Sequence, residues 1–234
     1  MERVESTVNF SGPKVMVFDV YETLLDMSEV ERKINALTDS KRGYPIWFEL
    51  FMEYCFVDNS LDTFHDFISI AKVTLQMAGN MLGKSISSRE ANDLLELLKH
   101  LPVHEEVQSG LSQLNDLGYT IIALTNAPEK TVCERMERTG LISYFETVLS
   151  AETVKKYKPE RKVYEWAVQK LNVKASDMLM ITAHGWDIAG ASNAGMKTAF
   201  VKRDKKLLYP LSPQPDISCS SLHEFVSKLQ EKQW

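Results

Sequence analysis

The chain has 234 residues, a formal net charge of −5 at pH 7 and 44% hydrophobic residues. This length suits one α/β body with a sizeable insertion, and the negative charge gives nucleic acid or an anionic membrane no electrostatic reason to bind. The apolar runs are too short to span a bilayer, and residues 1–14 lack the apolar stretch of a secretory signal. Three widely spaced cysteines, Cys55, Cys133 and Cys219, exclude a fully paired disulfide framework and a CxxC motif. We therefore expect a cytoplasmic protein with no nucleic-acid or membrane partner.

Four short apolar runs predict buried strands, at residues 15–18, 119–124, 177–181 and 199–201. Amphipathic patterns between and around these runs predict helices, at residues 107–117, 160–171 and 188–194. Strands that alternate with helices form βαβ units, so the expected fold class is α/β, with a parallel sheet that carries helices on both faces.

Residues 27–101 interrupt this alternation, because they contain no convincing strand. Helical patterns occupy residues 45–56, 61–81 and 87–100. Ser87 and Glu90 have the spacing of a capping box, which predicts the start of a helix. We expect residues 1–26 and 102–234 to form the core and residues 27–101 to form an inserted all-helical cap. The cap is expected over the carboxyl ends of the strands, where open α/β sheets place their sites.

Polar side chains follow three of the predicted strands, and a lysine precedes one of the predicted helices. These residues are Asp19, Thr125, Asn126, Lys158, Thr182, His184 and Asp187. Because the carboxyl ends of parallel strands meet at one edge of a sheet, we expect these groups to converge on one site.

In order and spacing, these residues resemble the L-2-haloacid dehalogenases of the haloacid dehalogenase superfamily. The resemblance covers about residues 14–203 and rests on four segments, namely FDVYETLLD at 18–26, LTN at 124–126, KP at 158–159 with Tyr164 beyond it, and ITAHGWDIAGA at 181–191. It implies a Rossmann-like core with a helical cap, and a hydrolase of short L-2-haloacids that gives the inverted 2-hydroxyacid. It also implies that no cofactor is needed.

The resemblance implies a role for each motif residue. Asp19 attacks the carbon that carries the halogen and forms an ester on the enzyme. Lys158 keeps Asp19 ionised, and Asp187 holds Lys158. The residues expected to bind the haloacid substrate are Tyr21, Phe48, Thr125, Asn126, Tyr164 and Thr182. We interpret Trp186 as a packing residue.

Tyr21 distinguishes this chain from the phosphatases of the superfamily. Those enzymes usually carry a second Asp two residues after the nucleophile, and that residue helps to hold magnesium. Only Asp187 follows Trp186, so the acidic pair of the magnesium site is also missing, and we expect no metal. A phosphatase acting on a small phosphate ester is therefore a less favoured alternative.

Three positions depart from the family pattern. Phe48 follows Trp47 where the family places a halide-binding Arg, which leaves the halide site undefined and favours a second alternative, a non-catalytic binding protein. Glu22 replaces a Gly and His184 replaces an Asn. If the two meet, Glu22 can orient His184 and His184 can act as general base on the water that hydrolyses the Asp19 ester. Otherwise Glu22 is a solvated acid and His184 is a hydrogen-bonded loop residue.

Two further expectations concern the whole chain. The aromatic residues of the segment 27–101 favour a homodimer, and the final thirty residues are expected to add little to the fold. A small-molecule haloacid is the only other expected partner.

Overall fold

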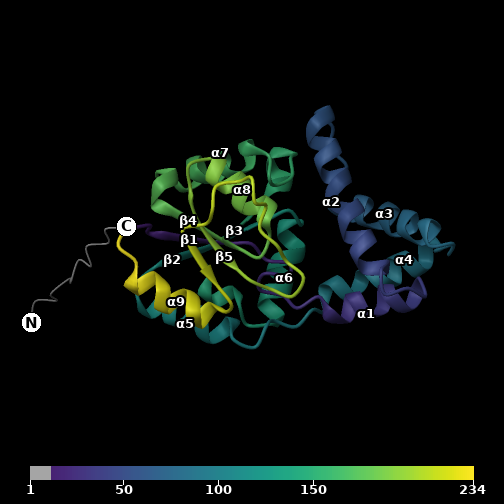
Figure 1. Cartoon of the computed structure of the whole chain (residues 1–234), viewed down its shortest axis with the longest axis horizontal. Coiled ribbons are helices and arrows are strands. Elements are labelled where there is room, and N and C mark those ends of the chain that lie inside the picture. The colour runs from purple at the N-terminus through teal and green to yellow at the C-terminus, as the bar shows by residue number, and fades with distance from the viewer. Residues whose placement is uncertain (1–11) are drawn as a thin grey trace, which may run out of the picture.

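A computed structural model describes residues 12–234 (Figure 1). Its strands form one parallel sheet in the order β3-β2-β1-β4-β5-β6. Their bounds are β1 Val15–Phe18, β2 Thr120–Thr125, β3 Thr147–Ser150, β4 Met178–Thr182, β5 Lys197–Val201 and β6 Ile217–Cys219. The chain reverses its direction of travel across the sheet at β1, so this central strand ends at the position where such folds place their sites.

Helices cover both faces of the sheet, which confirms the predicted fold class. Met16 and Phe18 of β1 pack on the face covered by α5 (Val107–Asp116), α6 (Glu129–Arg138) and α9 (Leu222–Glu231). Val15 and Val17 point to the opposite face, which α7 (Arg161–Leu171) and α8 (Gly185–Asn193) cover. Because both faces are buried, the central strands read as continuous apolar runs in the sequence.

The four predicted strands are present, and the sequence missed the two that lie at the edges of the sheet. Strands β3 and β6 have four and three residues, and Ser218 in the middle of β6 is exposed. Such short segments are defined by pairing with a neighbour, and their own composition carries little signal. The expectation that the last thirty residues add little is wrong, because β6 and α9 both lie in that stretch.

Residues 28–99 form helices and no strand, as predicted. Their bounds are α1 Ser28–Leu37, α2 Gly43–Leu61, α3 Phe67–Met81, α4 Ser88–Leu95 and a 3-10 turn at Glu96–Lys99. The capping box of Ser87 and Glu90 is present at the start of α4. The predicted helix at residues 61–81 begins later, because Asp62 takes a left-handed conformation that ends α2, and Asp66 caps α3.

Helices α1 to α4 gather beside the end of the sheet, on the right in Figure 1, and we propose residues 27–101 as the cap. The side chain of Asn59 on α2 makes two hydrogen bonds to the backbone of Tyr157 in the core. Residues 1–11 of the expected core lie outside the described part of the chain.

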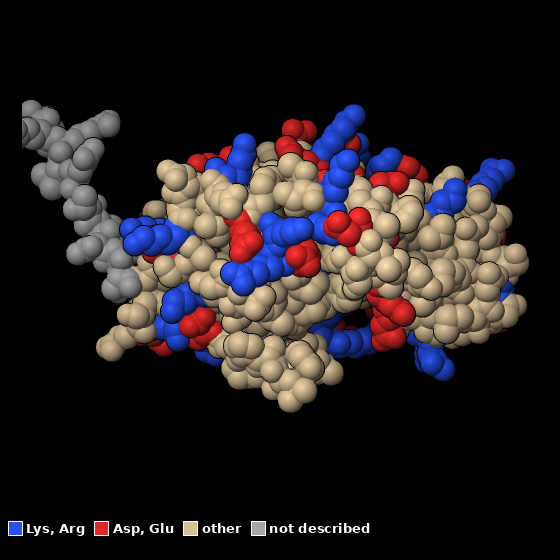
Figure 2. Space-filling model, turned by 90° about the horizontal axis from the view of Figure 1, so that it is seen from above, with Lys and Arg blue, Asp and Glu red and all other residues tan. Residues whose placement is uncertain are grey.

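The surface of the described region carries charges of both signs. Figure 2 shows Lys and Arg intermingled with Asp and Glu over the core, and a wider uncharged area toward the end formed by the cap helices. Within residues 12–234, no helix is both long and apolar enough to cross a membrane. Cys55, Cys133 and Cys219 are unpaired.

Candidate active site

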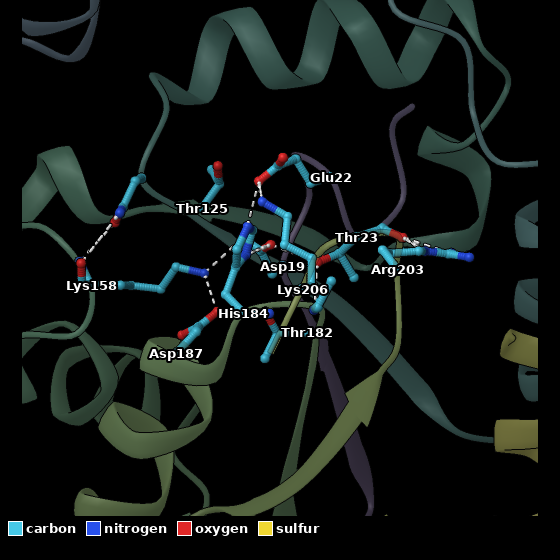
Figure 3. Close-up of polar contacts among 12 residues, drawn as sticks. Asp19, Glu22, Thr23, Thr125, Lys158, Thr182, His184, Asp187, Arg203 and Lys206 are labelled. Carbon is cyan, nitrogen blue, oxygen red and sulfur yellow. Dashed lines mark hydrogen bonds and ion pairs between the residues drawn. The ribbon is translucent and has the colours of Figure 1, made fainter. Parts of the chain in front are cut away.

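Asp19 directly follows β1, and its side chain lies at the centre of a buried polar network (Figure 3). Its Oδ1 accepts a hydrogen bond from Lys158 Nζ at 2.9 Å. Its Oδ2 accepts from Thr23 Oγ1 at 2.7 Å and lies 3.1 Å from His184 Nδ1. A carboxylate oxygen has two lone pairs. Oδ2 therefore has both engaged, whereas Oδ1 has one available.

Lys158 is fully buried and bridges two carboxylates. Its Nζ also donates to Asp187 Oδ2 at 2.8 Å and to the carbonyl of Leu124 at 2.9 Å. Tyr164 donates to the other oxygen of Asp187 at 2.6 Å. Asn126 accepts from the backbone N–H of Lys158 at 2.7 Å. The bonds from Lys158 Nζ to Asp19, Asp187 and Leu124 use all three ammonium protons, so the lysine is held in one position.

The charges of this network set its protonation. Burial raises the pKa of Asp19, but Lys158 and His184 outweigh that effect and hold the pKa well below its usual range. Burial also opposes the charge of Lys158, yet Asp187 and Asp19 raise its pKa. Burial raises the pKa of Asp187, against the effect of Lys158. At neutral pH Asp19 is thus an ionised carboxylate beside a protonated lysine.

Glu22 and His184, the two paired departures from the family pattern, are in contact. Glu22 Oε2 lies 2.7 Å from His184 Nε2, and its Oε1 accepts from Tyr44 OH at 2.7 Å. Lys206 forms an ion pair with the same carboxylate. Glu22 has a φ of 61°, a left-handed conformation that favours glycine and costs other residues roughly 1–2 kcal/mol. Its ion pairs offset that strain.

His184 lies between two carboxylates, and this decides its charge. Burial lowers its pKa, but its hydrogen bonds and charge interactions with Asp19 and Glu22 outweigh burial and raise the pKa to about 9. Burial raises the pKa of Glu22, yet His184 and Lys206 lower it to about 2. His184 is therefore an imidazolium at neutral pH, and each ring nitrogen donates to a carboxylate.

A small cavity of about 40 Å³ lies beside Asp19. Core and cap both line it, with Asp19, Tyr21, Thr125, Asn126, Ala127, His184 and Trp186 from the core and Phe48, Phe51, Met52 and Phe67 from α2 and α3. The rings of Phe48 and Trp186 stack on His184 at centroid distances of 5.9 and 4.8 Å. Trp186 is thus more than the packing residue that the sequence predicted.

Two residues predicted to bind substrate do not line this cavity. Tyr164 is buried beneath Asp187, and its hydroxyl is engaged there. Thr182 Oγ1 accepts from the backbone N–H of His184 at 3.1 Å. In this structure each of the two residues holds a neighbour in place, and neither lines the cavity beside Asp19. Thr125, which makes a similar bond to the Ala127 N–H, does reach the cavity.

Sequence reasoning missed three residues of the network. Thr23 lies within the first motif, so its place four residues after Asp19 was a usable signal. Tyr44 and Lys206 come from the cap and from the loop after β5, with no pattern that marks them. Lys206 Nζ lies 4.3 Å from the ring centre of Phe48, so a cation lies close to the position where the family has an Arg.

The acidic residues of the site do not form a metal centre. Among residues 12–234, no cluster of three or more His, Cys, Asp or Glu side chains has an arrangement that could hold a metal ion. Lys158 occupies the space between Asp19 and Asp187 and forms an ion pair with each of them.

The comparisons with known proteins agree on one family. Residues 16–201 match the family described as haloacid dehalogenase-like hydrolase. The chain is 26% identical to an (S)-2-haloacid dehalogenase of Pseudomonas sp. (strain YL) over 216 residues, 91% of this chain and 93% of that protein. It is also 26% identical to (S)-2-haloacid dehalogenase 1 of Pseudomonas sp. (strain CBS-3) over 221 residues, 92% of this chain and 96% of that protein.

A solved structure gives the same result for the fold. The L-2-haloacid dehalogenase from Xanthobacter autotrophicus with chloropropionic acid covalently bound superposes with a TM-score of 0.84 at 19% identity. The superposition covers 94% of this chain and all of that one. The predicted superfamily is confirmed, and this chain belongs to the haloacid dehalogenase-like hydrolase family.

Proposed function

We propose that the protein hydrolyses L-2-haloacids to 2-hydroxyacids through an ester on Asp19. The observation that carries the proposal is a buried, ionised carboxylate, that of Asp19, in the wall of an aromatic-lined cavity. The curated relatives are named for this reaction, and one structural neighbour holds chloropropionic acid covalently.

In the first half-reaction, Oδ1 of Asp19 attacks C2 of the substrate. The new O–C bond forms as the carbon–halogen bond breaks, and the bonding electrons leave with the halide, so C2 inverts. Thr125 and Asn126 bind the substrate carboxylate at the strand ends. The halide leaves into the aromatic part of the cavity beside Phe48.

The second half-reaction needs a base, and His184 supplies it. Once Asp19 is an ester, it no longer carries the charge that raises the pKa of His184, and the imidazolium releases its proton. Neutral His184 keeps Nε2–H on Glu22 and presents a bare Nδ1 beside the ester carbon. Glu22 acts through His184, so it is a positioning residue.

The protons balance in this scheme. Water oxygen bonds to Cγ of Asp19 while one water proton passes to His184 and then to the departing alkoxide as the Cγ–Oδ1 bond breaks. The second water proton returns to His184 when Asp19 regains its charge. The proton released after the first half-reaction is the acid that accompanies the halide in the overall reaction.

The test is halide release from both enantiomers of 2-bromopropionate, with Asp19→Asn as the control. We expect release from the L enantiomer by the wild-type protein and a loss of activity in Asp19→Asn. Release at equal rates by wild type and Asp19→Asn, or release from neither enantiomer, would contradict the proposal.

Two finer expectations also stay proposals. We expect a homodimer, which sedimentation of the purified protein tests. We also expect a cytoplasmic location, which fractionation of the source cells tests.

A further inference from the structure

A second, larger hollow lies outside the cavity beside Asp19. Its volume is about 470 Å³, within the range of roughly 300–1,000 Å³ that small-ligand pockets have. We call this hollow the vestibule. It shares Phe48, Met52 and Trp186 with the inner cavity, so the two spaces adjoin each other at these side chains.

Helix α2 forms one wall of the vestibule. Phe48, Met52, Phe56 and Ser60 recur every four residues and therefore lie on one side of the helix. Trp186 of the core faces this stripe, and its ring meets Phe56 edge-on at 6.1 Å. The vestibule is thus a mostly apolar hollow between α2 and Trp186, next to the cavity that contains Asp19.

The inner cavity is too small for a large substrate. Its 40 Å³ holds only a few atoms, since one ordered water needs about 10–15 Å³ on the same scale. A halogen and a carboxylate on C2 fill such a space. A longer substituent on C2 needs more room than this cavity has, and the vestibule is the larger space that adjoins it at Phe48 and Trp186.

Charge decides which end of a substrate points outward. Glu49 and Glu53 lie on the exposed side of the vestibule, and no lysine or arginine lines it. These glutamates would repel a second carboxylate in the vestibule. At the inner cavity, Thr125 and Asn126 supply hydrogen-bond donors and Lys158 supplies positive charge. The substrate carboxylate therefore lies inward and an uncharged tail lies outward.

We propose that the vestibule binds the apolar tail of the substrate, so that 2-haloacids with a neutral alkyl or aryl substituent on C2 are better substrates than 2-halopropionates. This inference rests on the proposed dehalogenase function and specifies its substrate class. The tail loses contact with water on one side along α2 and on the other along Trp186.

A chain-length series tests the inference. We expect kcat/KM for halide release to rise roughly threefold for each methylene added from 2-bromopropionate to 2-bromohexanoate, as expected for partial burial of each group. A matched diacid, 2-bromohexanedioate, should be a poorer substrate than 2-bromohexanoate. Values of kcat/KM that stay level or fall with chain length would overturn the inference while leaving the dehalogenase function intact.

Variants locate the effect in the vestibule. Ser60→Trp fills its outer end and should remove most of the gain for 2-bromohexanoate, with turnover of 2-bromopropionate unchanged. Leu61→Trp is the matched control, because Leu61 is exposed on the same helix and does not line the vestibule. Glu53→Gln should raise kcat/KM for the diacid severalfold and leave 2-bromohexanoate unchanged. Equal effects of Ser60→Trp and Leu61→Trp would place the tail elsewhere.

Binding of the unreactive products tests the inference without turnover. Calorimetry should give a lower Kd for 2-hydroxyhexanoate than for 2-hydroxypropionate, and Ser60→Trp should abolish the difference. If no bromoacid releases halide but this difference is found, the dehalogenase proposal fails and the tail site stands. Equal Kd values for the two products would overturn the tail site itself.

Discussion

Glu22 departs from the family pattern and has a strained backbone, because it replaces a glycine at a position with a left-handed conformation. A glycine would adopt the φ of 61° without strain, yet Glu22 keeps it while contacting His184, Tyr44 and Lys206. Through Glu22 and His184, these contacts connect the cap and the loop after β5 to Asp19. Six groups of the site (three carboxylates, two lysines and the imidazolium) together balance in charge, so an anionic substrate meets no net negative site.

Replacing Glu22 by Gln should lower the pKa of His184 from about 9 toward its ordinary value of 6.5. A histidine whose pKa is raised by folding stabilises the protein fully below pH 6.5, and that contribution disappears as the pH rises through 9. The variant should therefore lose stability mainly at low and neutral pH. NMR titration of the His184 ring measures the shift. Tyr44→Phe, which removes a neutral donor from the same carboxylate, should move the pKa less, and a wild-type value near 6.5 would refute the charged state.

His184→Asn should separate the two half-reactions. Alkylation of Asp19 needs no base, whereas hydrolysis of the ester loses a general base that contributes about 10²–10⁴-fold. We expect a burst of one equivalent of halide and a protein heavier by the acyl fragment in intact-mass spectra. Steady turnover without burst or adduct would show that another group activates the water.

Among the elements, the sequence predicted the strands whose residues are buried on both sides and most of the helices. Strand β1 was predicted at its observed bounds, because four buried apolar residues end at a buried aspartate. Helices α1, α6 and α9 were missed, although each buries an apolar face. The edge strands β3 and β6 were missed because pairing with a neighbour defines them.

The capping box of Ser87 and Glu90 is expected to stabilise the fold. Ser87→Ala removes the side chain that accepts from the Glu90 N–H, and it should cost about 1 kcal/mol of unfolding free energy. Ser85→Ala changes an exposed serine that is not part of the capping box, and it should have almost no effect. Urea denaturation of both variants compares them, and equal midpoints would mean that the box adds nothing to stability.

Motif spacing predicted part of the candidate site. Asp19, Lys158 and Asp187 meet as their order along the chain predicted, because strand ends in a parallel sheet share one edge. The role of Lys206 was not predictable, since its position depends on the path of an irregular loop.

At the scale of the whole molecule, the site exists only where cap and core meet. The core supplies Asp19 and its charge network, and the cap supplies Phe48, Phe51 and Phe67 to the cavity. Asn59 of the cap bonds to the backbone of Tyr157, next to Lys158, so the docking of the cap also positions the lysine.

Removal of divalent metal ions with EDTA tests whether the reaction depends on a metal ion. Lys158 bridges Asp19 and Asp187 at 2.9 and 2.8 Å and occupies the space between them. We expect halide release to continue in excess EDTA and to stay unchanged when Mg²⁺ is then added. Strict dependence on added Mg²⁺ would contradict the proposed reaction and favour the phosphatase alternative.

The central claim is that Asp19 forms the ester and that water then attacks its carboxyl carbon. A single turnover in ¹⁸O-labelled water, with enzyme in excess over (S)-2-bromopropionate, tests it most directly. We expect an unlabelled product hydroxyl, and we expect mass spectrometry to find the label in the peptide containing Asp19. Label in the product, with none in that peptide, would mean that water attacks the substrate directly and would contradict the covalent route.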